Sequence, residues 1–308
     1  MTKASNMGDM GDMGDIGSVG YGNGGDTGTA VLPDRVNLPF NIEAARVWNK
    51  DTKEWEYRGT ELGKIASMPA TMPTMAWLDR DWQGRWAAWR VLAEYAATDW
   101  RSIQITPWPE GPDQDTELEA LTRAAQDERA DALGEIVAQN ASYEDIMAYF
   151  FALLRVSSKS HPKMAQLLHV AGLAGILSAM YFKGRPGGES YPDKKPRLRP
   201  SQLRPALMPP IDIPGHPSFP SGHATQAMLM ALCIEETLPT QLVKDQWRPF
   251  LHTLAGRIAR NREIAGLHFE SDSRGGFELA AKAFDKLYGC PAFKDVVTGA
   301  TKEWTENA

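Results

Sequence analysis

Apolar residues recur at three- and four-residue steps through much of the chain, which is the period of an amphipathic helix. From about Asp81, the residues Trp89, Leu92 and Tyr95 follow this period and predict one buried helical face. Further helices are predicted over residues 116–139 (with Leu133 on the apolar face), 142–156, 164–182, from 221 onwards, 241–261 and 272–287. Because strictly alternating strand patterns are few, the chain is predicted to be all-α, a helical bundle with its chemistry on loops at one end.

Residues 164–182 form the most apolar of the predicted helices. This run has 19 residues without a formal charge, which is about the length that spans a bilayer. It also contains Gln166, His169 and Ser178, and the chain has no second run of this kind. We therefore expect a buried core helix and no membrane span.

The N-terminal residues 1–30 differ in composition from the rest of the chain. They repeat Met-Gly-Asp three times from Met7 to Asp15 and have few side chains to bury, so a disordered tail is predicted. They lack the apolar stretch of a secretory signal, which favours a cytoplasmic protein. Residues 31–308 are predicted to form a single helical domain, although the mixed pattern of residues 37–74 predicts no element.

The charge of the chain restricts its class of function. A net charge of −6 at pH 7 and a pI near 5.6 argue against a general nucleic-acid binder, which usually presents a basic face. Cys233 and Cys290 do not have a metal-ligand spacing, and two cysteines in a chain of this length favour a reduced setting. Any anion site must therefore be built by a local concentration of arginine and lysine.

Three clusters provide candidate chemistry. The first is the basic stretch from Lys194 to Arg204, inside a proline-rich loop over residues 184–220 in which no element is predicted. The second is the turn Pro220-Ser221-Gly222-His223, directly ahead of an apolar helical run. The third is Asn261-Arg262, followed by His268 and Asp272.

The residue types in these clusters suit a tetrahedral oxyanion. Orphan N–H groups at the helix start behind Ser221 favour an anion, and arginine adds bidentate donors. His268 and Asp272 are one helical turn apart, so the carboxylate can hold one imidazole N–H and fix the tautomer. His223 and His268 can then divide general acid–base work from that of a nucleophile or ligand.

The joint spacing resembles the signature of the type 2 phosphatidic acid phosphatase superfamily, which includes acid phosphatases and vanadium-dependent haloperoxidases. The family pattern is Lys-x6-Arg-Pro, then Pro-Ser-Gly-His, then Ser-Arg-x5-His-x3-Asp. The second and third parts match at every spacing, with Asn261 in place of the serine. The match lies in the motif region 183–272, and it implies the helical bundle of that family.

This resemblance implies a role for each matched residue. His268 would be the nucleophile of a phosphatase, or the axial ligand of the vanadium atom in a haloperoxidase, and Asp272 would orient it. His223 would act as general acid–base. The oxyanion would be bound by a lysine together with Arg199, Ser221, Gly222 and Arg262.

The lysine of the first motif has three candidate registers. Lys194 lies two residues after the expected position when Arg199 is the motif arginine, whereas Lys183 fits if an insertion follows it. Arg197 paired with Arg204 is the third register. The sequence Arg-Leu-Arg-Pro-Ser-Gln-Leu around Arg199 resembles bacterial members and favours Arg199 as the motif arginine.

His216 bears on the reaction, because vanadium bromoperoxidases also keep a histidine seven residues before the one in the turn. We therefore expect a haloperoxidase that uses a vanadate cofactor and hydrogen peroxide to oxidise halide, with bromide favoured. The alternatives are an acid phosphatase that hydrolyses phosphate esters through a phosphohistidine, and an inactive oxyanion-binding homologue. The expected partners are these small molecules and no nucleic acid, and a homo-oligomer stays open.

Overall fold

The structure, a computed structural model, describes residues 46–49, 51–57, 84–185 and 195–306. The chain divides into two units, Met1–Trp77 and Leu78–Ala308. The described part of the first unit is an antiparallel pair of strands, β1 (Arg46–Asn49) and β2 (Glu54–Tyr57), in which Trp48 pairs with Trp55. The predicted tail over residues 1–30 lies outside the described residues.

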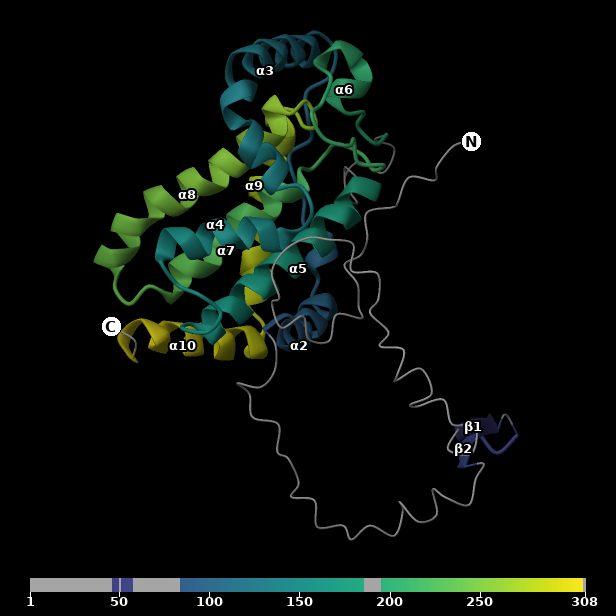
Figure 1. The fold of residues 1–308 in the computed structure, drawn as a ribbon, viewed down its shortest axis with the longest axis vertical. Helices are drawn as coiled ribbons and strands as arrows, with labels where there is room; N and C mark the ends of the chain where they lie inside the picture. Colours follow the sequence, from purple (N-terminus) through teal and green to yellow (C-terminus); the bar gives the residue numbers. More distant parts are fainter. Residues whose placement is uncertain (1–45, 50, 58–83, 186–194, 307–308) are drawn as a thin grey trace, which may run out of the picture. The chain divides into compact units, whose positions relative to one another are not determined.

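The described residues of the second unit form nine α-helices and no strand (Figure 1). These are α2 (Gly84–Ala97), α3 (Pro112–Ala138), α4 (Tyr143–Leu154), α5 (Pro162–Gly184), α6 (Pro200–Leu203), α7 (Gly222–Thr237), α8 (Gln241–Ile264), α9 (Glu270–Tyr288) and α10 (Pro291–Glu306). The prediction of an all-α protein is confirmed for this unit. The β1–β2 hairpin is the exception, in a segment for which no element was predicted.

Helices α4 and α7 begin where their capping residues predict. Ser142 Oγ accepts from the Glu144 N–H at 3.2 Å, and Asp145 Oδ2 accepts from the Ser142 N–H at 2.9 Å, which completes a capping box. Ser221 Oγ accepts from the Ala224 N–H at 3.4 Å at the start of α7. Each contact satisfies a backbone donor that the first helical turn leaves unpaired.

Three details differ from the sequence prediction. Helix α10 was not predicted, and it begins at Pro291, in the first turn where proline is tolerated. The short helix α6 lies inside the loop that was expected to hold no element. Trp89 and Leu133 are 47% and 44% exposed, so the apolar faces of α2 and α3 are narrower than the period alone indicates.

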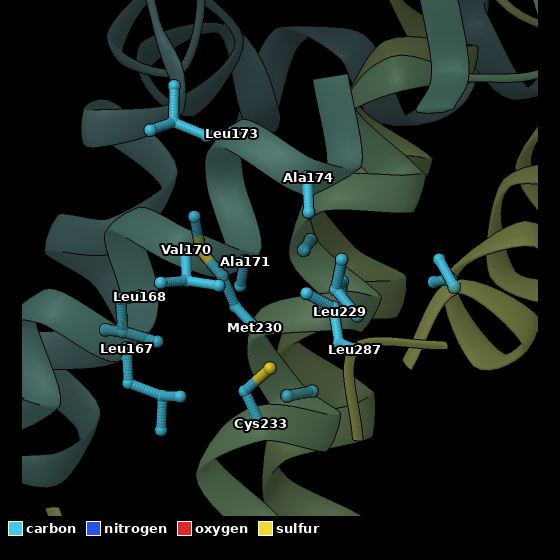
Figure 2. Packing of buried hydrophobic residues seen from close by; sticks show 14 of the residues in the cluster. Leu167, Leu168, Val170, Ala171, Leu173, Ala174, Leu229, Met230, Cys233 and Leu287 are labelled. Atoms are coloured by element: carbon cyan, nitrogen blue, oxygen red, sulfur yellow. The ribbon is translucent and has the colours of Figure 1, made fainter. Parts of the chain in front are cut away.

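Helices α5 and α7 form the centre of the second unit. Figure 2 shows their packed side chains, with Leu287 from α9 beside them: Leu167, Leu168, Val170, Ala171, Leu173, Ala174, Leu229, Met230 and Cys233. Among the described residues, α5 is the one helix long and apolar enough to cross a membrane, and 67% of its most apolar window is buried inside the unit. The prediction that this run is a buried helix is confirmed. Helices α3 and α6 lie at one end of the unit, and α2 and α10 at the other (Figure 1).

Candidate active site

His268 lies in the turn between α8 and α9, and its ring is held on both sides. Nδ1 is 3.3 Å from Asp272 Oδ2, and Nε2 is 3.4 Å from Arg199 Nη1. Because a carboxylate only accepts, Nδ1 carries the proton and Nε2 presents its lone pair. Burial lowers the pKa of His268 well below its usual range, against the opposing effect of its hydrogen bond to Asp272. The structure thus holds a neutral imidazole whose unprotonated nitrogen lies beside a guanidinium.

Asp272 is fully buried at the start of α9 and is kept ionised. Burial by itself raises the pKa of Asp272, but the hydrogen bond to His268 and the charge of Arg197 outweigh burial, and this pKa lies well below its usual range. Oδ2 also accepts from Ser218 Oγ at 2.5 Å and from the Phe269 N–H at 2.9 Å. These donors leave the carboxylate one orientation, in which it faces His268 Nδ1.

Three further cations are almost completely buried near His268. Lys183, Arg199 and Arg262 are each 1% exposed. Lys183 Nζ donates to the carbonyls of Pro217 and Ser218 at 2.7 and 2.8 Å, and Arg199 Nη1 donates to the Leu267 carbonyl at 2.9 Å. Burial lowers the pKa of Lys183 well below its usual range and that of Arg199 to about 10. Among the described residues, the hydrogen-bond partners of these three side chains are neutral carbonyls and imidazoles, so no hydrogen-bonded carboxylate compensates their positive charge.

Arg262, at the end of α8, is the least satisfied of the three. Nη2 donates to the Ile136 carbonyl at 2.5 Å, whereas Nε and Nη1 are buried without a partner among the described residues. Burial lowers the pKa of Arg262 to about 10. Buried donors are almost always paired in native proteins, so these two N–H groups indicate a missing acceptor.

The turn ahead of α7 is held tightly against α9. The Ser221 N–H donates to the Asp272 carbonyl at 3.0 Å. A Cβ atom added to Gly276 would lie 2.7 Å from the Ser221 carbonyl oxygen. Glycine is therefore required at position 276 for α9 to pack this close to the turn. The Ala224 N–H donates to Ser221 Oγ, whereas the N–H groups of Gly222 and His223 have no partner within the helix and are available to an anion.

His223 and His216 are both neutral in this arrangement. His223 Nε2 lies 2.8 Å from the Gln139 carbonyl, to which it donates. Burial, with the charge of Arg262, lowers the pKa of His223 to about 3. His216 Nδ1 lies 3.1 Å from Arg199 Nη2, and burial with the charges of Lys183 and Arg199 lowers its pKa to about 4.

The structure describes the residues of two of the three registers of the first motif. Lys183 enters the site, whereas Lys194 lies outside the described residues. Arg197 Nη1 donates to Asp272 Oδ1 at 2.7 Å, and its Nη2 donates to Glu117 Oε2 at 2.9 Å. Arg204 donates to Thr122 Oγ1 at 2.8 Å, away from His268. Arg197 therefore supports Asp272, and the register that pairs it with Arg204 does not form the site.

Sequence reasoning missed the contribution of α3. Its Glu117 binds Arg197 and also accepts from Ser271 Oγ at 2.9 Å. The carbonyls of Ile136 and Gln139, at the opposite end of α3, accept from Arg262 and His223. The amino-acid sequence does not show which main-chain carbonyls will accept hydrogen bonds from distant side chains. Glu117 is one acidic residue among many on this helix.

A groove of about 690 Å³ between α3 and α8 is separate from the candidate site around His268. It is lined by Asp127, Glu128, Asp131, Ala132, Glu135, Thr253, Gly256, Arg257, Arg260, Asn261 and Ile264. Arg257 pairs with Glu135 and Arg260 with Glu128. Of the motif residues, Asn261 alone lines it, so the groove is not the site defined by His268.

Replacing Arg197 with methionine is expected to lower the free energy of unfolding by about 3–5 kcal/mol, because the variant leaves buried Asp272 without its cation. Urea denaturation of the purified variant measures this. Adding Asp272→Asn should restore part of the loss, since it removes the unpaired charge. A loss below about 1 kcal/mol, the value of a surface pair, would contradict the role given to Arg197.

The unfolding free energy is also expected to fall as the pH is lowered from about 6.5 towards 4. The pKa values of His216, His223 and His268 lie below the ordinary value of 6.5 in the folded protein. The unfolded chain therefore takes up protons in this range that the folded protein excludes, and acid favours unfolding. Denaturation curves at about pH 7.5, 6.5, 5.5 and 4.5, which bracket the ordinary histidine pKa of about 6.5, give the slope of the unfolding free energy against pH. His216→Gln should reduce this slope, and a flat profile in the wild type would contradict the buried neutral state.

No protein-family model and no curated protein matches the chain. The functional assignment therefore rests on the site and on the motif resemblance.

Proposed function

We propose that this protein is a vanadate-dependent haloperoxidase that oxidises halide with hydrogen peroxide, with bromide favoured. The observation that carries the proposal is Arg262, a buried guanidinium with two N–H groups that have no partner among the described residues. Leaving a charge buried and uncompensated costs several kcal/mol. A tetrahedral oxyanion would supply both the missing acceptors and the missing negative charge.

The donor set fits vanadate, and it fits phosphate equally well. Lys183, Arg199 and Arg262 would hold the oxygens of the anion, with the hydroxyl of Ser221 and the Gly222 N–H beside them. His268 Nε2, the unprotonated nitrogen, would bind the central atom. When bound, vanadate would supply a Lewis-acidic centre that activates hydrogen peroxide towards halide.

The reaction X⁻ + H₂O₂ + H⁺ → HOX + H₂O consumes one proton, and we assign the delivery of this proton to His223. Its pKa of about 3 reflects burial and then the charges of Arg262, Lys183 and Arg199. A bound oxyanion offsets those charges, and it therefore raises the pKa of His223 towards the working pH. Asp272, held by Arg197, keeps the Nδ1 proton of His268 in place during this exchange.

His216 supports the choice of a peroxidase over a phosphatase. Its Nδ1 accepts from Arg199 Nη2 at 3.1 Å, so the histidine that the bromoperoxidases share is in contact with a proposed oxyanion-binding arginine. The finer fold assignment, a bundle of the vanadium haloperoxidase and acid phosphatase type, belongs to the same proposal. It is supported by the helical unit and by the convergence of Lys183, Arg199, Arg262 and His268.

One protein preparation assayed in two ways tests the proposal. Bromination of a dye by peroxide is measured with and without added orthovanadate, beside hydrolysis of a phosphate ester. We expect bromination that depends on vanadate. Hydrolysis without bromination would instead make the chain a phosphatase that uses His268 as nucleophile, and the absence of both would make it an inactive oxyanion-binding homologue.

A further inference from the structure

Gln139, the C-cap residue of α3, has a buried carboxamide whose nitrogen lacks a hydrogen-bond partner among the described residues. Its side chain is completely buried. Oε1 accepts from Asn261 Nδ2 at 3.0 Å, whereas Nε2 has no hydrogen-bond partner among the described residues. A buried amide donor without an acceptor is unfavourable, so a partner for Nε2 is expected from outside the described chain.

The orientation of this carboxamide is fixed by Asn261 and, through Asn261, by Glu135. Asn261 Nδ2 donates to Glu135 Oε2 at 2.9 Å as well as to Gln139 Oε1. A carboxylate accepts and does not donate, so the Asn261 nitrogen must face Glu135 and Gln139 together. Turning the Gln139 amide over would place two donors against each other. Gln139 Nε2 is therefore directed away from Asn261.

The position of Gln139 places it among the proposed oxyanion-binding groups. Its main-chain carbonyl accepts from His223 Nε2 at 2.8 Å, and the carbonyl of Ile136 accepts from Arg262 Nη2. The unpaired amide nitrogen thus belongs to a residue that contacts His223 through its main-chain carbonyl and contacts Asn261, the residue before Arg262, through its side chain. Gln139 Nε2, Arg262 Nε and Arg262 Nη1 are thus three buried nitrogens without a partner among the described residues, and a bound oxyanion would supply acceptors for them.

We infer that Gln139 is an additional ligand-binding residue, and that its Nε2 donates a hydrogen bond to an oxygen of the bound oxyanion. The inference rests on the proposed function. It assigns Asn261, which stands in place of the family's serine, the task of orienting this donor. The ligand class is a tetrahedral oxyanion with an acceptor oxygen on the side of His223, represented by orthovanadate or inorganic phosphate.

Titration calorimetry of the full chain with orthovanadate and, separately, with inorganic phosphate tests this inference. Gln139→Met keeps the shape and removes the donor, and we expect both dissociation constants to rise about tenfold. Gln139→Glu keeps an acceptor for Asn261 but places a carboxylate oxygen where the donor was. Repulsion of the anion should then raise the constants more than about a hundredfold. Gln126→Met, an exposed change on the same helix, is the control and should bind as the wild type does.

The outcomes separate this inference from the proposed function. If the wild type binds neither anion, the oxyanion site itself is wrong, and the role of Gln139 is overturned with it. If the wild type binds and Gln139→Met binds equally well, Gln139 alone is wrongly assigned. Circular dichroism melting checks that each variant folds. If Gln139→Met does not fold, Gln139→Glu decides the question, and unchanged affinity in that variant would overturn the inference.

Discussion

His268→Ala is expected to remove bromination altogether, with a loss of at least about 10³-fold. His268 Nε2 is the unprotonated nitrogen beside Arg199, and the bond that it would make to the central atom has no substitute among the described side chains. Vanadate affinity should fall by more than about 100-fold. Phosphate affinity should fall much less, by about tenfold, because in the proposed site phosphate would be held by Lys183, Arg199 and Arg262 without a covalent bond.

The control for this variant is His161→Ala. His161 caps the opposite end of α5 from Lys183, about 30 Å away along a helix of this length. It should leave bromination and both affinities unchanged. Equal loss of vanadate and phosphate affinity in His268→Ala would contradict the direct bond to His268, and full activity would remove His268 from the site.

Arg262→Met is expected to change stability and binding in opposite directions. Without ligand, the variant should be at least as stable as the wild type, because a buried and uncompensated charge has been removed. Anion affinity should fall about 100-fold or more, since two charge-assisted hydrogen bonds are lost. At a phosphate concentration of about 100 times the wild-type dissociation constant, stabilisation by phosphate should drop from about 2.7 to about 0.4 kcal/mol.

Thermal unfolding with and without phosphate measures both effects. Arg248→Met, on the exposed surface of the same helix α8 and paired there with Glu235, is the matched control and should respond to phosphate as the wild type does. If Arg262→Met is strongly destabilised without ligand and keeps its response to phosphate, Arg262 is a structural residue that requires no anion.

The residues of the candidate site that the sequence predicts are those whose spacing along the chain determines their positions in one helix or at its start. His268 and Asp272 are four residues apart, and the start of α9 brings them into contact. Ser221 caps α7, as expected for a hydroxyl residue followed by an apolar run. Arg199, Arg262 and His223 follow from the joint motif, which places them near the ends of helices that converge.

The remaining contacts depend on packing between segments that are distant in the chain. The partners of Arg197 are Glu117, 80 residues away, and Asp272, 75 residues away. The sequence does not show that Lys183, at the end of α5, donates to the carbonyls of Pro217 and Ser218, 34 and 35 residues away. The contact between Asn261 and Gln139 likewise depends on the packing of α8 against the end of α3, which the sequence does not show.

The helical boundaries show the same division between local and tertiary effects. Helix α4 begins at its predicted capping box, whereas α10 was missed. Trp89 follows the apolar period of α2 but is exposed, because periodicity identifies one face of a helix and does not say how wide the covering neighbours are.

Reconstitution with orthovanadate is the most direct test of the central claim, that the buried cations and His268 form a vanadate site that oxidises halide. Protein freed of bound anions is titrated with orthovanadate while bromination by peroxide is followed. We predict that activity rises from the background to a plateau at one vanadate per chain, and that excess phosphate lowers it by competition. Bromination that is independent of vanadate, or a protein that binds vanadate at this site and remains inactive with bromide and peroxide, would contradict the account.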